Sequence, residues 1–87
     1  MLPPPLTSAQ IRAARALIRW SAQELAEHCA VSVTTIRRAE LMPSATALTR
    51  VNDHVIRQAL EKAGVEFIDE NGGGPGVRLR NPPPTKT

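Results

Sequence analysis

The sequence predicts a compact, mainly α-helical domain that ends in a β-hairpin. Through residues 8–64 the apolar residues recur at three- and four-residue steps, which is the spacing of amphipathic helices. Residue pairs that cap the starts of helices recur in the same stretch. Beyond residue 64 the apolar residues alternate with polar ones on both sides of a glycine-rich loop, as is typical of a hairpin. We therefore expect four to five helices followed by two strands.

The first two helices each begin at a capping box, in which two side chains three residues apart accept hydrogen bonds from each other's backbone N–H groups. Thr7 and Gln10 form the first box, and the helix that follows ends near Trp20. Ser21 and Glu24 form the second box, which opens a short helix that ends near His28. Both helices are expected to bury one apolar face.

The third helix spans residues 33–40 and is capped by Ser32. Its apolar residues Ile36 and Ala39 face inward, and its arginines face outward. Only residues 29–31 separate it from the preceding helix. Two short helices joined by so tight a turn form a helix-turn-helix unit.

The chain breaks again at Pro43, and residues 44–48 fit a single helical turn. Thr49 then caps a longer helix that ends at Ala63, because Gly64 occupies the position that ends helices. The expected apolar face of this last helix consists of Val51, Val55, Ala59 and Leu60.

The hairpin has one apolar face, and Glu66 faces Arg78 or Arg80 on the other. A lone two-stranded ribbon is marginally stable in water, so the apolar face must pack on something. We expect a dimer contact with a second copy first; the alternatives are a cover on the domain's own helices and a DNA-contacting wing. The residues of this face are Val65, Phe67, Val77 and Leu79.

Composition divides the chain into four segments. Residues 1–7 are a flexible proline-rich tail, residues 8–64 the helix-turn-helix domain, residues 65–80 the hairpin, and residues 81–87 a disordered proline-rich tail. With 87 residues there is room for one small domain, which makes a partner subunit a reasonable expectation.

Several classes of protein are excluded by composition. The single cysteine, Cys29, allows neither an internal disulfide nor a cysteine-rich zinc site. There is no apolar run of the ~20 residues that cross a bilayer and no signal-peptide pattern, so we expect a cytoplasmic protein. Because no nucleophile, base and orienting acid are arranged for catalysis, we expect no enzyme and no cofactor. His28, Cys29 and His54 are too few and too scattered for a zinc site, so we also expect no metal.

Positive charge is concentrated in the helical part of the chain. The formal net charge is +3, and residues 1–60 contain seven arginines against four acidic residues, whereas residues 61–87 are neutral. Arginine suits phosphate because its planar fork donates two parallel hydrogen bonds. A solvated basic surface without a nucleic-acid partner is the alternative explanation.

The segment from Leu25 to Glu40 resembles the phage repressor/Cro-type helix-turn-helix regulators, the XRE family. It contains a Leu-Ala pair, a small residue and Val in the turn, a capping Ser, then Thr-Ile and a closing Glu. Ala30 stands where that family most often has glycine. The resemblance covers residues 8–64 and implies a lambda-repressor-like fold, with the helix of residues 33–40 in the DNA major groove. It also implies a bacterial transcription regulator of the repressor type, a dimer on an inverted-repeat operator and therefore at the nucleoid.

The same resemblance implies which side chains contact DNA. Arg37 would read a base, Arg38 would contact a base or phosphate, Thr34 a base or phosphate, and Val33 a thymine methyl group. The remaining candidates would position phosphates through side chains and helix N-termini. The full set is Ser21, Gln23, Ser32, Val33, Thr34, Thr35, Arg37 and Arg38.

Each candidate also has a structural explanation. Ser21 and Ser32 cap helices whether or not DNA is bound, and Gln23 and the two arginines can simply be solvated. Glu40 is expected to hold Arg12 or Arg15, and not to contact cytosine. Trp20 is expected to close the edge of the core, with no base to stack on.

A second function remains open. The chain can instead be a protein-binding module, either antitoxin-like or an antagonist of another regulator, that uses the hairpin or the proline-rich ends. The modest net charge and the exposed hairpin edge motivate this alternative.

Overall fold

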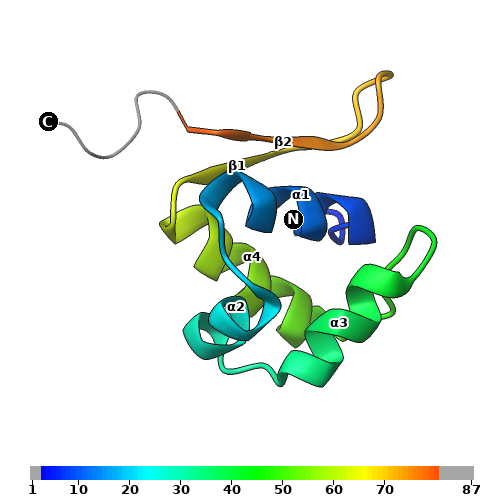
Figure 1. The fold of residues 1–87 in the computed structure, drawn as a ribbon. Coiled ribbons are helices and arrows are strands. Elements are labelled where there is room, and N and C mark those ends of the chain that lie inside the picture. Colours follow the sequence, from blue (N-terminus) through cyan, green and yellow to red (C-terminus); the bar gives the residue numbers. More distant parts are fainter. Residues whose placement is uncertain (1–2, 81–87) are drawn as a thin grey trace, which may run out of the picture.

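Four helices and one two-stranded hairpin make up residues 3–80, the part of the chain that this computed structural model describes (Figure 1). The helices within it are too short and too polar to cross a membrane. The predicted tail of residues 81–87 lies outside the described residues. The elements are α1 (Ser8–Ile18), α2 (Ala22–Cys29), α3 (Val33–Leu41), α4 (Arg50–Lys62), β1 (Val65–Ile68) and β2 (Gly76–Leu79).

The helix starts are those that the capping residues predict. Thr7 and Gln10 form the expected box before α1, with Thr7 Oγ1 3.1 Å from the Gln10 amide nitrogen. Ser21 and Glu24 form the box before α2. Thr49 caps α4 by accepting from the amide of residue 52 at 3.1 Å. Local sequence therefore determines where these helices begin.

The core lies between the four helices and the hairpin. Ile11, Leu25, Ile36, Ile56 and Leu60 are completely buried, so each helix contributes at least one side chain to a single cluster. The hairpin lies across α1 and α4, on the side of the molecule away from α3 (Figure 1). The buried members of the cluster are Leu6, Ile11, Ala14, Ala22, Leu25, Ala26, Cys29, Val31, Ile36, Ile56, Leu60 and Val65.

The predicted helical turn at residues 44–48 is wrong. This segment contains no helix: Ala45 forms an isolated antiparallel bridge with Thr7, and Ala47 lies in the left-handed region at φ 63°. Ser8 fixes the segment by donating its amide to the Ser44 carbonyl at 2.9 Å and its hydroxyl to the Met42 carbonyl at 2.8 Å. The start of α1 thus supplies the hydrogen bonds that a helical turn would have supplied internally.

The predicted apolar face of α4 is wrong at Val51, which is 71 % exposed. The inward face runs through Ile56 and Leu60, which lie one turn apart. At about 100° per residue, Val51 lies on the opposite side of the helix from Leu60. Val55 and Ala59 pack at the edge of the core as expected.

The segment before α1 does not form the predicted free tail. Leu6 is only 1 % exposed, and its amide donates to Asp53 Oδ1 at 2.9 Å. Two residues before Leu6, the Pro4 carbonyl accepts a hydrogen bond from Arg57 Nη2 at 2.8 Å. Both partners lie on α4, so burial of one leucine and two hydrogen bonds attach this segment to the domain.

The hairpin forms with the predicted apolar residues on one face, and most of that face covers the chain's own core. Val65 pairs with Leu79 and Phe67 with Val77, while Glu66 pairs with Arg78 across the exposed face. Val65 is completely buried, and Phe67 and Val77 pack against the core cluster. The predicted dimer contact is therefore wrong at Val65, because residues of the same chain bury this side chain.

Leucine 6 provides a test of the attached segment. We expect Leu6→Ala to lower the free energy of unfolding by about 2–4 kcal/mol, because it leaves a cavity in the core. Leu41→Ala, at a residue that is 83 % exposed, should change it by less than about 0.5 kcal/mol. Urea denaturation of both variants measures the difference; equal small effects would show that the segment is free in solution.

Candidate functional site

The outward side of α3 exposes two adjacent arginines. Arg37 and Arg38 are exposed, and neither forms an ion pair or a hydrogen bond with any of residues 3–80. Thr34 is exposed one turn before Arg38. On the opposite side of the helix, Ile36 is fully buried and Ala39 is 1 % exposed. The amphipathic pattern of α3 therefore fixes which side its arginines occupy.

The hydroxyl groups at the start of α3 already have partners. Ser32 Oγ accepts from the Thr35 amide at 3.1 Å and donates to Thr35 Oγ1 at 2.8 Å. Val33 is half-buried and packs against the core. Of the four predicted residues at this end of the helix, Thr34 alone is exposed without a hydrogen bond among the described side chains.

The two predicted residues before and in α2 are exposed. Ser21 is the N-cap, and its oxygen lies 3.0 Å from the Glu24 amide nitrogen. Gln23 donates through Nε2 to Glu27 Oε2 at 3.3 Å along the helix surface. The structural role of Ser21 as a cap is thus observed, and both side chains are accessible to a partner molecule.

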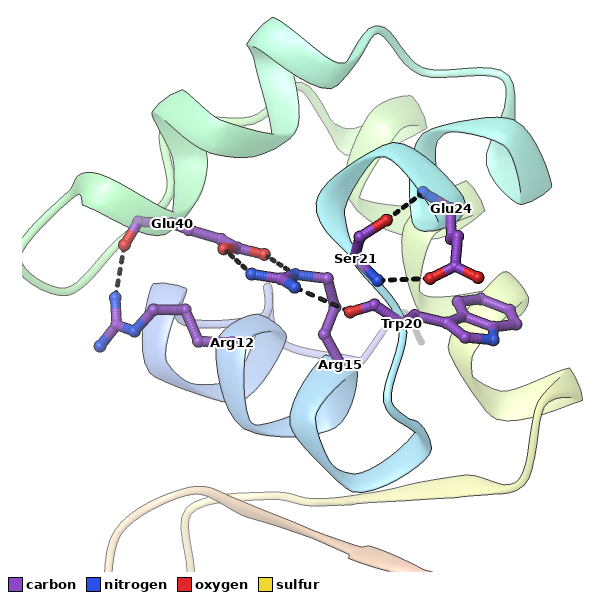
Figure 2. Close-up of polar contacts among 6 residues, drawn as sticks. All are labelled: Arg12, Arg15, Trp20, Ser21, Glu24 and Glu40. Carbon is purple, nitrogen blue, oxygen red and sulfur yellow. Dashed lines mark hydrogen bonds and ion pairs between the residues drawn. The ribbon is translucent and has the colours of Figure 1, made fainter.

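Glu40 fixes the end of α3 against α1. Its two carboxylate oxygens accept from Arg15, with Oε2 2.6 Å from Nε and Oε1 2.7 Å from Nη2 (Figure 2). Arg12 Nη1 donates to the backbone carbonyl of the same glutamate. The carboxylate is 8 % exposed, so this is a nearly buried, bidentate pair. The prediction that Glu40 holds an arginine of the first helix is confirmed, with both arginines bound.

Arg15 joins three parts of the chain. Besides Glu40 in α3, it donates through Nη1 to the Trp20 carbonyl at 2.8 Å, in the junction between α1 and α2 (Figure 2). The hydrogen bonds that Arg15 donates to the Glu40 carboxylate raise the pKa of its guanidinium above the ordinary value. Because one planar side chain makes all these contacts, α1, α2 and α3 have a fixed relative position.

The turn between α2 and α3 contains a strained alanine. Ala30 has φ 58° and ψ 31°, and its amide donates to the Ala26 carbonyl at 2.9 Å, so it ends α2 in the left-handed region. A side chain carries an energetic cost in this region that glycine does not. The left-handed backbone conformation at position 30 therefore favours glycine over alanine.

The sequence does not predict a groove that lies on another side of α2. It has a volume of about 970 Å³ and is bounded by the C-terminal parts of α2 and α4 and by Arg80. Trp20 stacks on His28 along its wall, with ring centroids 4.1 Å apart. The lining residues are spread over sixty positions of sequence and share no local pattern, so no motif signals them. No group of three or more metal-binding side chains is present in the described part of the chain.

Two of the domain's Arg–Glu pairs, one nearly buried and one exposed, provide a matched test. We expect Arg15→Met to lower the free energy of unfolding by about 2–4 kcal/mol, because it leaves the carboxylate of Glu40 nearly buried without a partner. Arg78→Met breaks the pair with Glu66 on the solvent-exposed face and should leave stability unchanged within error. Thermal and urea denaturation measure both; similar losses would contradict the role given to Arg15.

The strained turn predicts a stabilising substitution. Ala30→Gly should raise the free energy of unfolding by about 0.5–1 kcal/mol, because glycine adopts the left-handed conformation without a steric cost. Ala13→Gly, in the exposed middle of α1, should lower it by a similar amount. Urea denaturation curves with unchanged slopes check both signs, and destabilisation by Ala30→Gly would contradict the backbone assignment.

The geometry thus provides a rigidly held helix with two unpaired arginines on its outer side. The chain matches no family model and no curated protein sequence. Function is therefore inferred from the arrangement of its own side chains.

Proposed function

We propose that this protein is a sequence-specific, double-stranded-DNA-binding transcription regulator of the XRE type, which inserts α3 into the major groove. The observation that carries this proposal is the pair Arg37 and Arg38, exposed and without partners on a helix that Glu40 holds firmly against α1. An α-helix fits the width of the major groove, where guanine presents two acceptors to one arginine fork.

The order of the elements supports a helix-turn-helix unit. α2 and α3 are separated by residues 30–32 only, and α1 contacts α3 from behind through Arg15 and Glu40. In such a unit the second helix occupies the groove and the first lies across the backbone. We assign base contacts to Arg37 and Thr34, and a base or phosphate contact to Arg38.

The remaining predicted contacts act on phosphate or at the edge of a base. Ser21 and Gln23 at the start of α2 are exposed, and the free N–H groups there attract an anionic oxygen. Val33 is half-buried, which leaves part of its side chain for a thymine methyl group. The Ser32 hydroxyl donates to Thr35 Oγ1, so Ser32 can donate to phosphate only by exchanging that bond, whereas the Thr35 hydroxyl proton stays available for phosphate.

We further propose that two copies bind an inverted repeat, as a repressor that occupies a promoter in the cytoplasm. Two-fold symmetry places the two α3 helices about 34 Å apart, one turn of DNA. Leu79 at the outer end of β2 is 44 % exposed, which makes the hairpin edge the surface for the second copy. The competing function is a protein-binding module, which the exposed hairpin edge favours.

Selection of bound duplexes from a random library, followed by anisotropy titration of the selected DNA, tests the proposal. Arg37→Ala should weaken binding by about 1–3 kcal/mol, five- to 150-fold, and relax the preference at one base position. Arg38→Ala should weaken it as well, and affinity should fall steeply with salt, because binding releases counterions. An inverted repeat in the selected sequences would support the dimer.

Arg78→Ala is the matched control, because it removes the same charge from an exposed arginine on the hairpin. Its affinity should equal that of the unaltered protein; a large loss there would favour the hairpin as a DNA wing. If no duplex is selected and a protein co-purifies instead, the protein-binding alternative replaces the proposal.

A further inference from the structure

The groove between α2 and α4 combines an apolar wall with a cationic rim. Trp20, Val55 and Ala59 supply apolar surface, and Cys29 closes the groove from the core side. Burial raises the pKa of the Cys29 thiol, so this side chain is an inert, neutral part of the wall. In Figure 2 the indole ring of Trp20 extends away from the Arg15–Glu40 pair, so the groove is separate from this ion pair.

Two stacked rings form part of the apolar wall of the groove. The planes of Trp20 and His28 are inclined by 20° at a centroid separation of 4.1 Å, which is a stacked arrangement. His28 Nδ1 is 2.8 Å from the Glu24 carbonyl, and this contact fixes the imidazole within the stack. A planar apolar molecule gains contact area on such a surface without displacing either ring.

Cationic side chains outnumber acidic ones at the rim. Glu61 is the one acidic residue that lines the groove, and its Oε2 lies 3.9 Å from Arg57 Nη1 on the same helix. Lys62 is exposed and forms no ion pair with any described residue. Arg80 Nη2 donates to the backbone carbonyl of Glu61 at 2.6 Å, which holds its guanidinium at the rim and leaves other N–H groups available.

We infer that this groove is a binding site for a small aromatic carboxylate. The ring of the ligand would lie along Trp20 and the aliphatic wall, and its carboxylate would accept hydrogen bonds from Arg80 and Lys62. Charge complementarity favours an anion over a neutral or cationic molecule, because the cations of the rim outnumber its uncompensated acidic groups. The volume of about 970 Å³ lies within the range of small-molecule sites.

The site adjoins the segment that leads to α3. Ala30, the strained residue that ends α2, is part of its lining. A bound ligand therefore contacts the turn whose conformation sets the direction of α3. Binding itself is independent of the proposed DNA function, and it is tested without DNA.

Trp20 is the only tryptophan of the chain, so its fluorescence reports on the groove directly. The probe is 3-phenylpropionate, with its neutral amide, 3-phenylpropionamide, as the matched ligand. We expect saturable change of Trp20 emission by the carboxylate and at least about fivefold weaker binding of the amide, the factor that corresponds to about 1 kcal/mol. Calorimetry of the full chain supplies the stoichiometry of one ligand per chain.

Substitutions at the rim test the assignment of the charges. Lys62→Gln and Arg80→Gln should each weaken binding of 3-phenylpropionate about fivefold, whereas Arg78→Gln, two residues away on the exposed face of β2, should leave it unchanged. Circular dichroism checks that all three variants keep the helical content of the unaltered chain.

Four results would overturn the inference. Equal affinity for the acid and the amide, or no emission change at millimolar ligand, would remove the anion site. A Trp20 emission that changes on dilution of the protein alone would assign the groove to a second copy. Binding that appears only after removal of residues 81–87, which follow directly on Arg80, would assign it to the chain's own proline-rich end.

Discussion

The nearly buried Arg15–Glu40 pair is the constraint on which the presentation of α3 depends. A helix of nine residues has little intrinsic stability in water, so its position must come from tertiary contacts. Ile36 and Ala39 supply apolar contacts, but apolar contacts are not directional and do not by themselves fix the position of the helix. The bidentate fork is directional, because it works only when the guanidinium and the carboxylate are coplanar and in register. The Arg15–Glu40 pair therefore gives α3 a defined orientation on α1.

Much of the fold could be predicted because its determinants are local. The capping residues Thr7, Ser21 and Thr49 mark helix starts through bonds to residues three positions later, and the alternation around the glycine-rich loop marks the hairpin. The failures are at places where distant segments decide. The helical turn predicted at residues 44–48 is absent where Ser8 binds the carbonyls of Met42 and Ser44, and Leu6 is buried because Asp53 and Arg57 hold the segment around it. Ser8, Asp53 and Arg57 are all far in sequence from the segments that they hold, so local sequence patterns do not indicate these contacts.

The candidate site shows the same division. The outward direction of Arg37 and Arg38 follows from helical periodicity, which the sequence displays. Periodicity does not indicate that Ser32 and Thr35 bind each other, or that Val33 packs into the core. The groove beside Trp20 is built from residues in four separate segments, and only the packing of α2 on α4 brings them together. Sequence patterns reveal faces of single elements, whereas concave sites arise between elements.

Gln10 has two roles whose combination affects how the molecule opens. Its amide oxygen, 2.9 Å from the Thr7 nitrogen, completes the start of α1, while its amide nitrogen donates to the Gly76 carbonyl at 3.0 Å. The side chain is 5 % exposed in the folded domain, so releasing the hairpin breaks its hydrogen bonds to the Ile68 and Gly76 carbonyls and opens the amide to water. Fraying at one end of the chain is thereby coupled to fraying at the other, and the hairpin and the first turn of α1 belong to a single cooperative unit of local unfolding.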